Sequence, residues 1–244
     1  MNTVEKYYSQ QSVAVTGELK KAIEDKEYKT LIWVRYAIRN LIKTKGMPEV
    51  LKQLARIKIT GVESKRQFKN LLTEIHAACF LSKTLGETVL EVESKSHKVK
   101  SPYAKPNKAC DIKTLANDEE LYYEVKDASS EITNSYQKNG VTYFEPMEGD
   151  KVEQWLKNQT KEADRCGANY LICRVPVWRQ DASNTEEFYY KWLNEVMKKL
   201  FIIQCRLSKQ KIIVKTSFSV SPHLKGIYIL KAFGHIKVLF DRLI

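Results

Sequence analysis

The segment from Ala109 to Asp127 constrains the fold most, because it has the pattern of two short strands joined by a turn at Asn117-Asp118. Successive strand side chains alternate between faces, so Glu124 and Lys126 are expected on one face, roughly 6–7 Å apart. The other face, expected to meet the core, takes Leu121, Tyr123 and Val125. Ionic groups thus occupy positions where a strand buried on both faces would be apolar.

Asp111 lies at the start of the first predicted strand, where it can reach the same end of the sheet as Glu124. Two carboxylates and the ammonium of Lys126 meeting there would bind a divalent cation and hold a nucleophilic water beside it. Alternating Glu and Lys also occur on solvated edge strands, so these residues alone leave both interpretations open.

The spacing of Asp111, twelve residues and then Glu124-x-Lys126 resembles the motif of the PD-(D/E)xK nuclease superfamily. The resemblance covers about residues 64–175. It implies an α/β fold with a restriction-endonuclease-like core, in which helices flank a central mixed β-sheet, plus an N-terminal helical segment. One departure is Cys110, which stands where the motif often has Pro; that position does not ligate metal.

The chain length of 244 residues fits one large domain or a domain with a helical extension. We expect residues 1–62 to form an N-terminal helical extension packed on the core and residues 63–180 to form the nuclease-like core. Residues 181–244 would add a C-terminal helix and strands to the same domain. Helices are predicted from Ser64-x-x-Gln67 to Gly86 and over 150–166 and 184–201, and further strands over 88–95, 170–175, 211–220, 227–233 and 236–240.

Two polar side chains fall on otherwise apolar helical faces, where each needs a partner. Glu74 stands where the resemblance places an acidic residue that contributes to the metal site; a salt bridge to a nearby lysine is the alternative. Gln159 is predicted on the inward stripe of the helix over 150–166. Some members of the superfamily carry an active-site Gln on this helix, and an ordinary border residue is the alternative.

The charge balance favours polyanionic partners, since 41 Lys and Arg against 29 Asp and Glu give a net charge of +12. Nucleic acid is favoured over a membrane surface. Basic residues crowd the segment around Asp111, where they suit a phosphate-rich ligand, although a mobile lysine-rich loop is the alternative. The candidate phosphate-binding residues are Lys98, Lys100, Lys105, Lys108 and Lys113.

Several classes of protein lack support in the sequence. The five cysteines are widely spaced without a Cys-x-x-Cys pair, and no phosphate loop, dinucleotide fingerprint, nucleophile elbow or His-Glu-x-x-His pair occurs. No apolar signal core and no membrane-spanning run are found, so we expect an intracellular protein, cytoplasmic or nucleoid or nuclear.

The resemblance implies a mechanism as well as a fold. Asp111, Glu124 and the carbonyl of Val125 would ligate Mg²⁺ or Mn²⁺, with Glu74 reaching the ion directly or through water. Lys126 would orient or deprotonate the attacking water. We therefore expect a metal-dependent endonuclease that hydrolyses phosphodiester bonds of nucleic acid, DNA rather than RNA, of the restriction, defence or repair type; a homodimer is compatible with this.

Two alternatives remain open at the level of sequence. One is a catalytically inactive, nuclease-like protein that binds nucleic acid. The other is a basic scaffold or interaction protein whose charges only solvate its surface.

Overall fold

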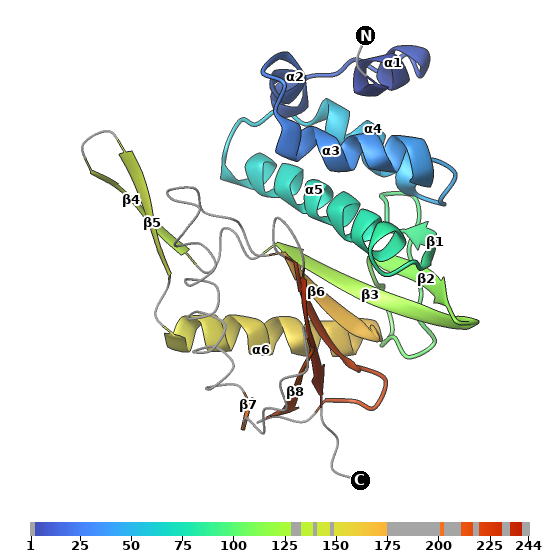
Figure 1. Cartoon of the computed structure of the whole chain (residues 1–244), viewed down its shortest axis with the longest axis vertical. Helices are drawn as coiled ribbons and strands as arrows, with labels where there is room; N and C mark the ends of the chain where they lie inside the picture. The colour runs from blue at the N-terminus through green and yellow to red at the C-terminus, as the bar shows by residue number, and fades with distance from the viewer. Residues whose placement is uncertain are drawn as a thin grey trace. The chain divides into compact units, whose positions relative to one another are not determined.

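The chain forms two compact units, Met1–Val125 and Lys126–Ile244, in a computed structural model (Figure 1). The division falls inside a strand, β3 (Glu119–Asp127). The structure describes residues 3–127, 133–138, 141–146, 149–174, 201–202, 211–216, 220–230 and 235–240.

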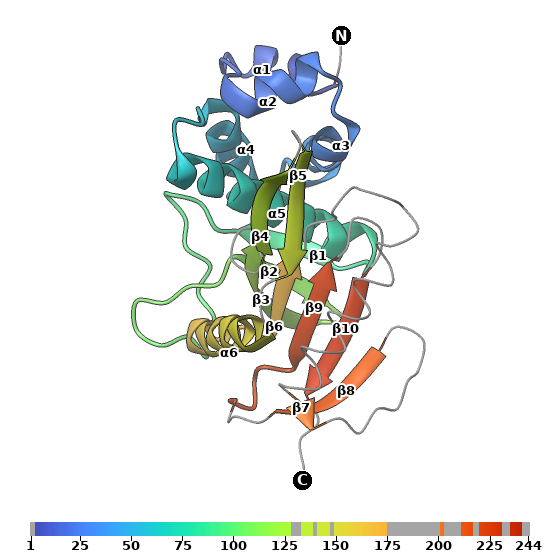
Figure 2. The same cartoon turned by 90° about the vertical axis from the view of Figure 1, so that its left-hand side faces the viewer.

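Helices make up the first part of the first unit, as the sequence predicted for residues 1–62. Figures 1 and 2 show these helices layered on the long helix α5, whose other side meets the first strands of the chain. The helical elements are α1 (Thr3–Gln10), α2 (Gly17–Glu24), α3 (Tyr28–Tyr36), the π-helical turn η1 (Ala37–Leu41), α4 (Met47–Arg56) and α5 (Val62–Lys83).

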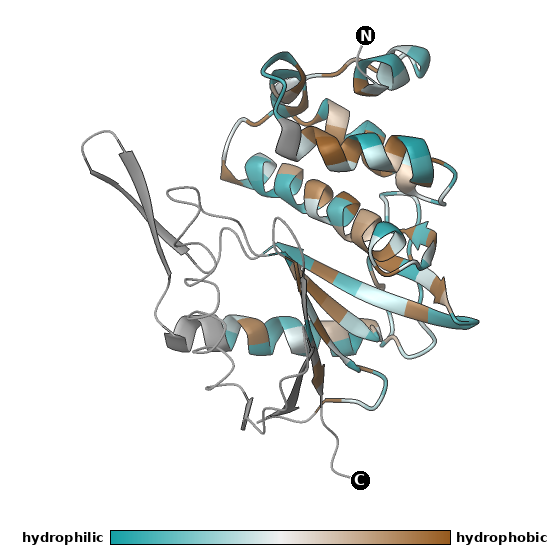
Figure 3. Cartoon of the chain, viewed as in Figure 1, coloured by the Kyte–Doolittle hydropathy of each residue, from teal (hydrophilic) through white to brown (hydrophobic). Residues whose placement is uncertain are grey.

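The second half of α5 is buried on every side, because it lies between α3 and strand β1 (Thr88–Val92). Residues 75–81 are all buried, and Figure 3 shows the apolar character of this part of the helix. A helix that is apolar on every side must be covered on every side, as residues 77–81 of this helix are. The core of this unit therefore lies on both sides of α5.

The start of α5 differs from the predicted capping pattern. Ser64 was expected to open the helix, but α5 begins at Val62 and Ser64 is its third residue. The Ser64 hydroxyl accepts hydrogen bonds from the backbone N–H groups of Thr60 and Gly61, at 2.9 and 3.1 Å. The serine thus satisfies the exposed N–H groups from inside the first turn and not from the cap position.

Three antiparallel strands, β1, β2 (Ile112–Ala116) and β3, complete the first unit. The predicted hairpin is confirmed. Asn117 and Asp118 join β2 to β3 with φ angles of 48° and 62°, the left-handed conformation that a two-residue hairpin turn of type I′ requires. Ile112 pairs with Tyr123, and this register decides which side chains share a face.

The core-facing side of these strands contains a buried carboxylate. Glu87 is 9% exposed and accepts hydrogen bonds from the Thr114 hydroxyl at 2.6 Å and the Tyr123 hydroxyl at 2.8 Å. Both donors are almost completely buried, so water cannot replace either one.

We expect Tyr123→Phe to lower the free energy of unfolding by about 1–3 kcal/mol, since a buried carboxylate loses a donor. Urea denaturation of the full chain measures the change. The matched control is Tyr122→Phe, whose hydroxyl donates at 2.9 Å to the exposed Glu120 and should cost less than about 1 kcal/mol. An equal loss in both variants would contradict the prediction.

The second unit contains α6 (Gly149–Cys166) and five strands of a mixed sheet. Strand β6 pairs parallel with β9, β9 antiparallel with β10, β10 parallel with β8, and β8 antiparallel with β7. The expectation of an α/β chain with a mixed sheet is confirmed. The strands are β6 (Tyr170–Arg174), β7 (Phe201–Ile202), β8 (Lys211–Thr216), β9 (Gly226–Leu230) and β10 (His235–Phe240).

Two segments of this unit differ from the sequence predictions or fall outside the described residues. Between β3 and α6, where no strand was assigned from sequence, the structure contains the hairpin β4 (Thr133–Lys138) and β5 (Val141–Pro146). Of the helix predicted over 184–201, residues 184–200 lie outside the described residues, and Phe201 belongs to β7. Across the described part of the chain, no helix combines the length and apolar character needed to cross a lipid bilayer.

Candidate active site

Asp111 directly precedes β2, and its carboxylate lies beside the part of β3 that carries Glu124. The Asp111 backbone N–H donates to the Tyr123 carbonyl at 3.0 Å, and its carboxylate Oδ2 accepts from the Val125 N–H at 2.6 Å. The regular pairing of β2 with β3 ends at Ile112 and Tyr123, so Asp111 lies just beyond the paired residues. The structure therefore holds the Asp111 carboxylate at the backbone of Val125, the residue that follows Glu124.

Glu124 is a buried acidic residue, with only 4% of its surface exposed. A charged carboxylate is costly at that depth unless cations or hydrogen-bond donors surround it. Its strand neighbours Tyr123 and Val125 turn to the opposite face, which packs in the core. Glu124 is thus a buried acidic residue on the face of β3 that the sequence assigned to the site.

A lysine ammonium lies among the carboxylates near Asp111. Lys98, from the loop between β1 and β2, donates a hydrogen bond to Glu93, and this bond is the main reason why the pKa of Lys98 is raised. Burial opposes that shift, and the negative charges of Glu93, Asp111 and Glu74 add to it. Glu74, on α5, therefore lies within electrostatic reach of the same ammonium as Asp111.

The donors available here suit a hard divalent cation, because Mg²⁺ and Mn²⁺ prefer carboxylate and carbonyl oxygens. Within the described residues, however, no group of three or more His, Cys, Asp or Glu side chains is placed to hold a metal ion. The arrangement is the Asp111 carboxylate bonded to the backbone N–H that follows Glu124, with Glu74 and Asp111 both acting on the ammonium of Lys98.

Lys126 follows on β3, two residues after Glu124, and is the first residue of the second unit. Strand alternation puts its side chain on the same face of β3 as that of Glu124. In the second unit its charge acts on Cys173 of β6: burial raises the pKa of that thiol to about 12, and Lys126 opposes the shift. The next residue, Asp127, pairs with Arg174 at 3.7 Å.

Gln159 does not belong to the buried stripe of α6 in which the sequence placed it. It is half-buried on the flank, and Thr160 takes the fully buried position with 1% exposure. The Thr160 hydroxyl donates to the Leu156 carbonyl at 2.8 Å, so a polar residue is accommodated there without a distant partner. The border-residue interpretation of Gln159 fits this position.

The five candidate phosphate-binding lysines divide into two kinds. Lys98 is bonded to Glu93, and Lys113 pairs with Glu120 at 2.7 Å, which raises the pKa of Lys113. Lys100 and Lys105 are exposed, whereas Lys108 is half-buried. Lys100 and Lys105 are therefore better placed to contact a phosphate backbone than Lys98 and Lys113, which bond to carboxylates.

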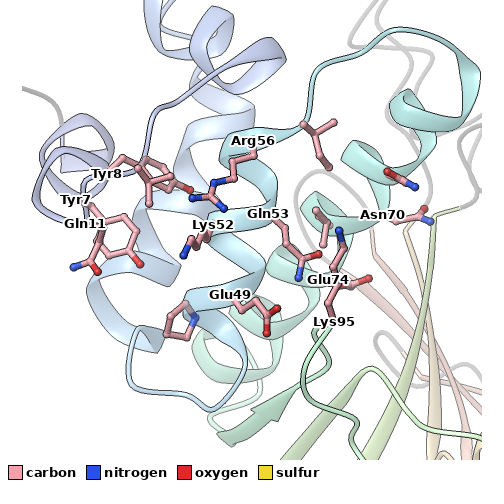
Figure 4. Close-up of a pocket in the computed structure, with 15 residues that line it drawn as sticks. Tyr7, Tyr8, Gln11, Glu49, Lys52, Gln53, Arg56, Asn70, Glu74 and Lys95 are labelled. Carbon is pink, nitrogen blue, oxygen red and sulfur yellow. The ribbon is translucent and has the colours of Figure 1, made fainter.

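Sequence reasoning missed a pocket in the first unit with a volume of about 910 Å³. Figure 4 shows its side chains coming from α1, α4 and α5 and from Lys95, which follows β1. Glu74 lines this pocket as well as acting on Lys98. A signal existed in the pair Lys52 and Arg56, four residues apart on one face of α4. The residues that give the pocket its polar character include Tyr7, Gln11, Lys52, Arg56, Asn70 and Lys95.

Comparison of the chain with protein-family models, with curated proteins and with solved structures finds no significant match.

Proposed function

We propose that this protein is a metal-dependent phosphodiesterase of the PD-(D/E)xK type that cleaves nucleic acid internally, DNA in preference to RNA. The supporting observation is the hydrogen bond from the backbone N–H of Val125 to the Asp111 carboxylate. This bond holds the first acidic residue of the motif beside the strand that carries its Glu124-x-Lys126 part. Sequence spacing alone did not require that alignment.

The proposed ligands are Asp111, Glu124, the Val125 carbonyl and Glu74, which would hold Mg²⁺ or Mn²⁺. A bound divalent ion supplies positive charge against the negative charge that develops on the phosphate during cleavage. Lys126 orients the attacking water and takes part in moving its proton. The hydrogen bond from Val125 keeps the Asp111 carboxylate in one orientation, which favours ligation by its other oxygen.

The direct test incubates the full chain with plasmid, linear double-stranded DNA, single-stranded DNA and RNA, each in Mg²⁺, Mn²⁺ or EDTA. Cleavage that requires the divalent ion and converts supercoiled plasmid to nicked or linear product supports the proposal. If no substrate is cut under any condition while nucleic acid is bound, the catalytic part of the proposal is wrong.

A binding protein without catalysis is the second candidate, and one observation favours it. The ammonium of Lys98 already lies among Glu93, Asp111 and Glu74, where it offsets negative charge as a metal ion would. In that case nucleic acid binds with equal affinity to the wild type and to Asp111→Asn, and neither protein cuts it.

Nucleic-acid binding should depend steeply on salt, because the chain carries a net charge of +12. If about six phosphates are contacted, log K falls with log[salt] at a slope of roughly −5. A double variant, Lys100→Gln with Lys105→Gln, should flatten the slope by up to about 2 units, with similar losses on unrelated sequences. Fluorescence anisotropy of a labelled duplex in Ca²⁺ across a salt series measures this.

The charge-matched control for that experiment is Lys21→Gln with Lys65→Gln, since both lysines are exposed on helices of the same unit. The control should keep the wild-type slope. A slope that falls equally in both double variants shows a general effect of net charge, and an unchanged slope in the Lys100 and Lys105 variant places the phosphate contacts elsewhere.

A further inference from the structure

The pocket in the first unit has a polarity that runs from one end to the other. In Figure 4, Tyr7 of α1 and Gln11, which follows α1, lie at one end, Lys52 and Arg56 of α4 come next, and Glu74 and Lys95 lie at the opposite end. Its volume of about 910 Å³ lies within the range of roughly 300–1,000 Å³ found for small-ligand sites. An aromatic group, cations and amides in one such pocket suit a ligand with both a ring and a negative charge.

The cations of this pocket are available to a ligand. Lys52, Arg56 and Lys95 are exposed and make no ion pair with any residue that the structure describes. The acidic neighbour of Lys52, Glu49, accepts hydrogen bonds from the Ser94 hydroxyl at 2.6 Å and from Ser96. These hydrogen bonds from the two serines stabilise the charged carboxylate and so lower the pKa of Glu49. A planar guanidinium one turn from an ammonium is a suitable phosphate partner.

At the aromatic end of the pocket, the ring of Tyr7 packs against a buried neighbour, Tyr8. The ring of Tyr7 meets that of Tyr8 edge to face, with centroids 5.1 Å apart and an interplanar angle of 67°. Tyr8 is 1% exposed, and its hydroxyl donates to the Leu51 carbonyl at 2.8 Å. Tyr7 is half-buried, and burial raises its pKa. A fixed, partly exposed aromatic ring is what bases stack on in proteins that bind single strands.

The pocket adjoins the candidate active site through Glu74, which lines the pocket and acts on Lys98 together with Asp111. We propose that the pocket binds one unpaired nucleotide of the substrate strand, with its phosphate at Lys52 and Arg56 and its base against Tyr7. A base paired within a duplex is not available to such a pocket, whereas an unpaired base is. This inference rests on the proposed function and adds that the substrate carries a single-stranded segment next to the cut.

Titration calorimetry of the full chain with deoxythymidine 5′-monophosphate, in EDTA, tests the pocket separately from metal binding and catalysis. Arg56→Gln and Lys52→Gln should each weaken binding about tenfold or more, as expected for a lost charged hydrogen bond to phosphate. Tyr7→Leu should weaken it about tenfold through lost stacking. Lys21→Gln, on the exposed face of α2, and Asp111→Asn should bind as the wild type does.

Two results would overturn the assignment: no binding of the nucleotide at millimolar concentration, or inorganic phosphate binding as tightly as the nucleotide with no effect of Tyr7→Leu. Thermal melting of each variant confirms that it is folded. If the nucleotide binds as expected while no nucleic acid is cut, the proposed function fails and the pocket stands.

A second measurement addresses the unpaired state of the base. The Arg56→Gln change, made in the Asp111→Asn background, should weaken binding of a single-stranded 12-mer about tenfold more than binding of a blunt duplex of the same length. An equal loss on both ligands shows that Arg56 follows a duplex backbone, and it overturns the claim that the pocket selects an unpaired nucleotide.

Discussion

Asp111→Asn should abolish divalent-ion-dependent cleavage and weaken Mn²⁺ binding by more than about tenfold, since even outer-sphere changes around a metal cost 10–100-fold in affinity. The fold should survive the change, because the amide oxygen of Asn can still accept the hydrogen bond from the Val125 N–H that Asp111 Oδ2 accepts at 2.6 Å. What is lost is the negative charge. Calorimetric titration with Mn²⁺ and a plasmid-cleavage assay measure the two effects on the same preparation.

The matched control for this charge is Glu24→Gln, on the surface of α2, where the carboxylate only pairs with Lys20 at 3.7 Å. That variant should bind Mn²⁺ and cleave as the wild type does. Undiminished Mn²⁺ affinity in Asp111→Asn would remove Asp111 from the ligand set, whatever happens to cleavage.

Lys126→Ala should lose cleavage by a factor of hundreds or more, which is the range for a general acid or base, while Mn²⁺ affinity is retained. Lys126 brings no ligand atom to a metal, so the two measurements should separate in this variant, whereas they fall together in Asp111→Asn. Single-turnover cleavage at saturating Mn²⁺ isolates the chemical step from binding.

Lys21→Ala is the control for removing one lysine, because Lys21 is exposed on α2 and does not line the pocket. Loss of the Lys126 charge also removes an influence that lowers the pKa of Cys173, so thermal melting must show that the second unit stays folded. If Lys126→Ala cleaves within about threefold of the wild type, the strand is merely solvated and the Glu-x-Lys interpretation is wrong.

Local sequence patterns determined much of the secondary structure in both units. The hairpin at Asn117-Asp118 follows from two residues that tolerate positive φ between alternating strands. The buried half of α5 follows from a run that is apolar on every side, and α6 ends at Cys166 before Gly167, whose φ is 74°. These features depend on neighbours within a few residues, so sequence alone contains enough information to predict them.

Sequence patterns predicted the structure poorly where local signals are weak. The connection over 127–149 reads as polar and carries few strand signals, yet it contains β4 and β5, which pair with each other. Gln159 and Thr160 are adjacent on α6, and only packing decides which of them is buried. The choice depends on how a helix is rotated against its sheet, which no local propensity encodes.

The candidate site was determined partly by sequence and partly by tertiary structure. Alternation on β3 determined that Glu124 and Lys126 share a face, but only the tertiary structure decided that the Asp111 carboxylate bonds to the backbone N–H of Val125. The tertiary structure also decided three further features: the hydrogen bond from Lys98 to Glu93, the pairing of Lys113 with Glu120, and the pocket between α1, α4 and α5. Tyr7, Lys52 and Glu74 come from three separate helices, and their meeting follows from helix packing, which joins residues far apart in the chain and leaves no trace in local spacing.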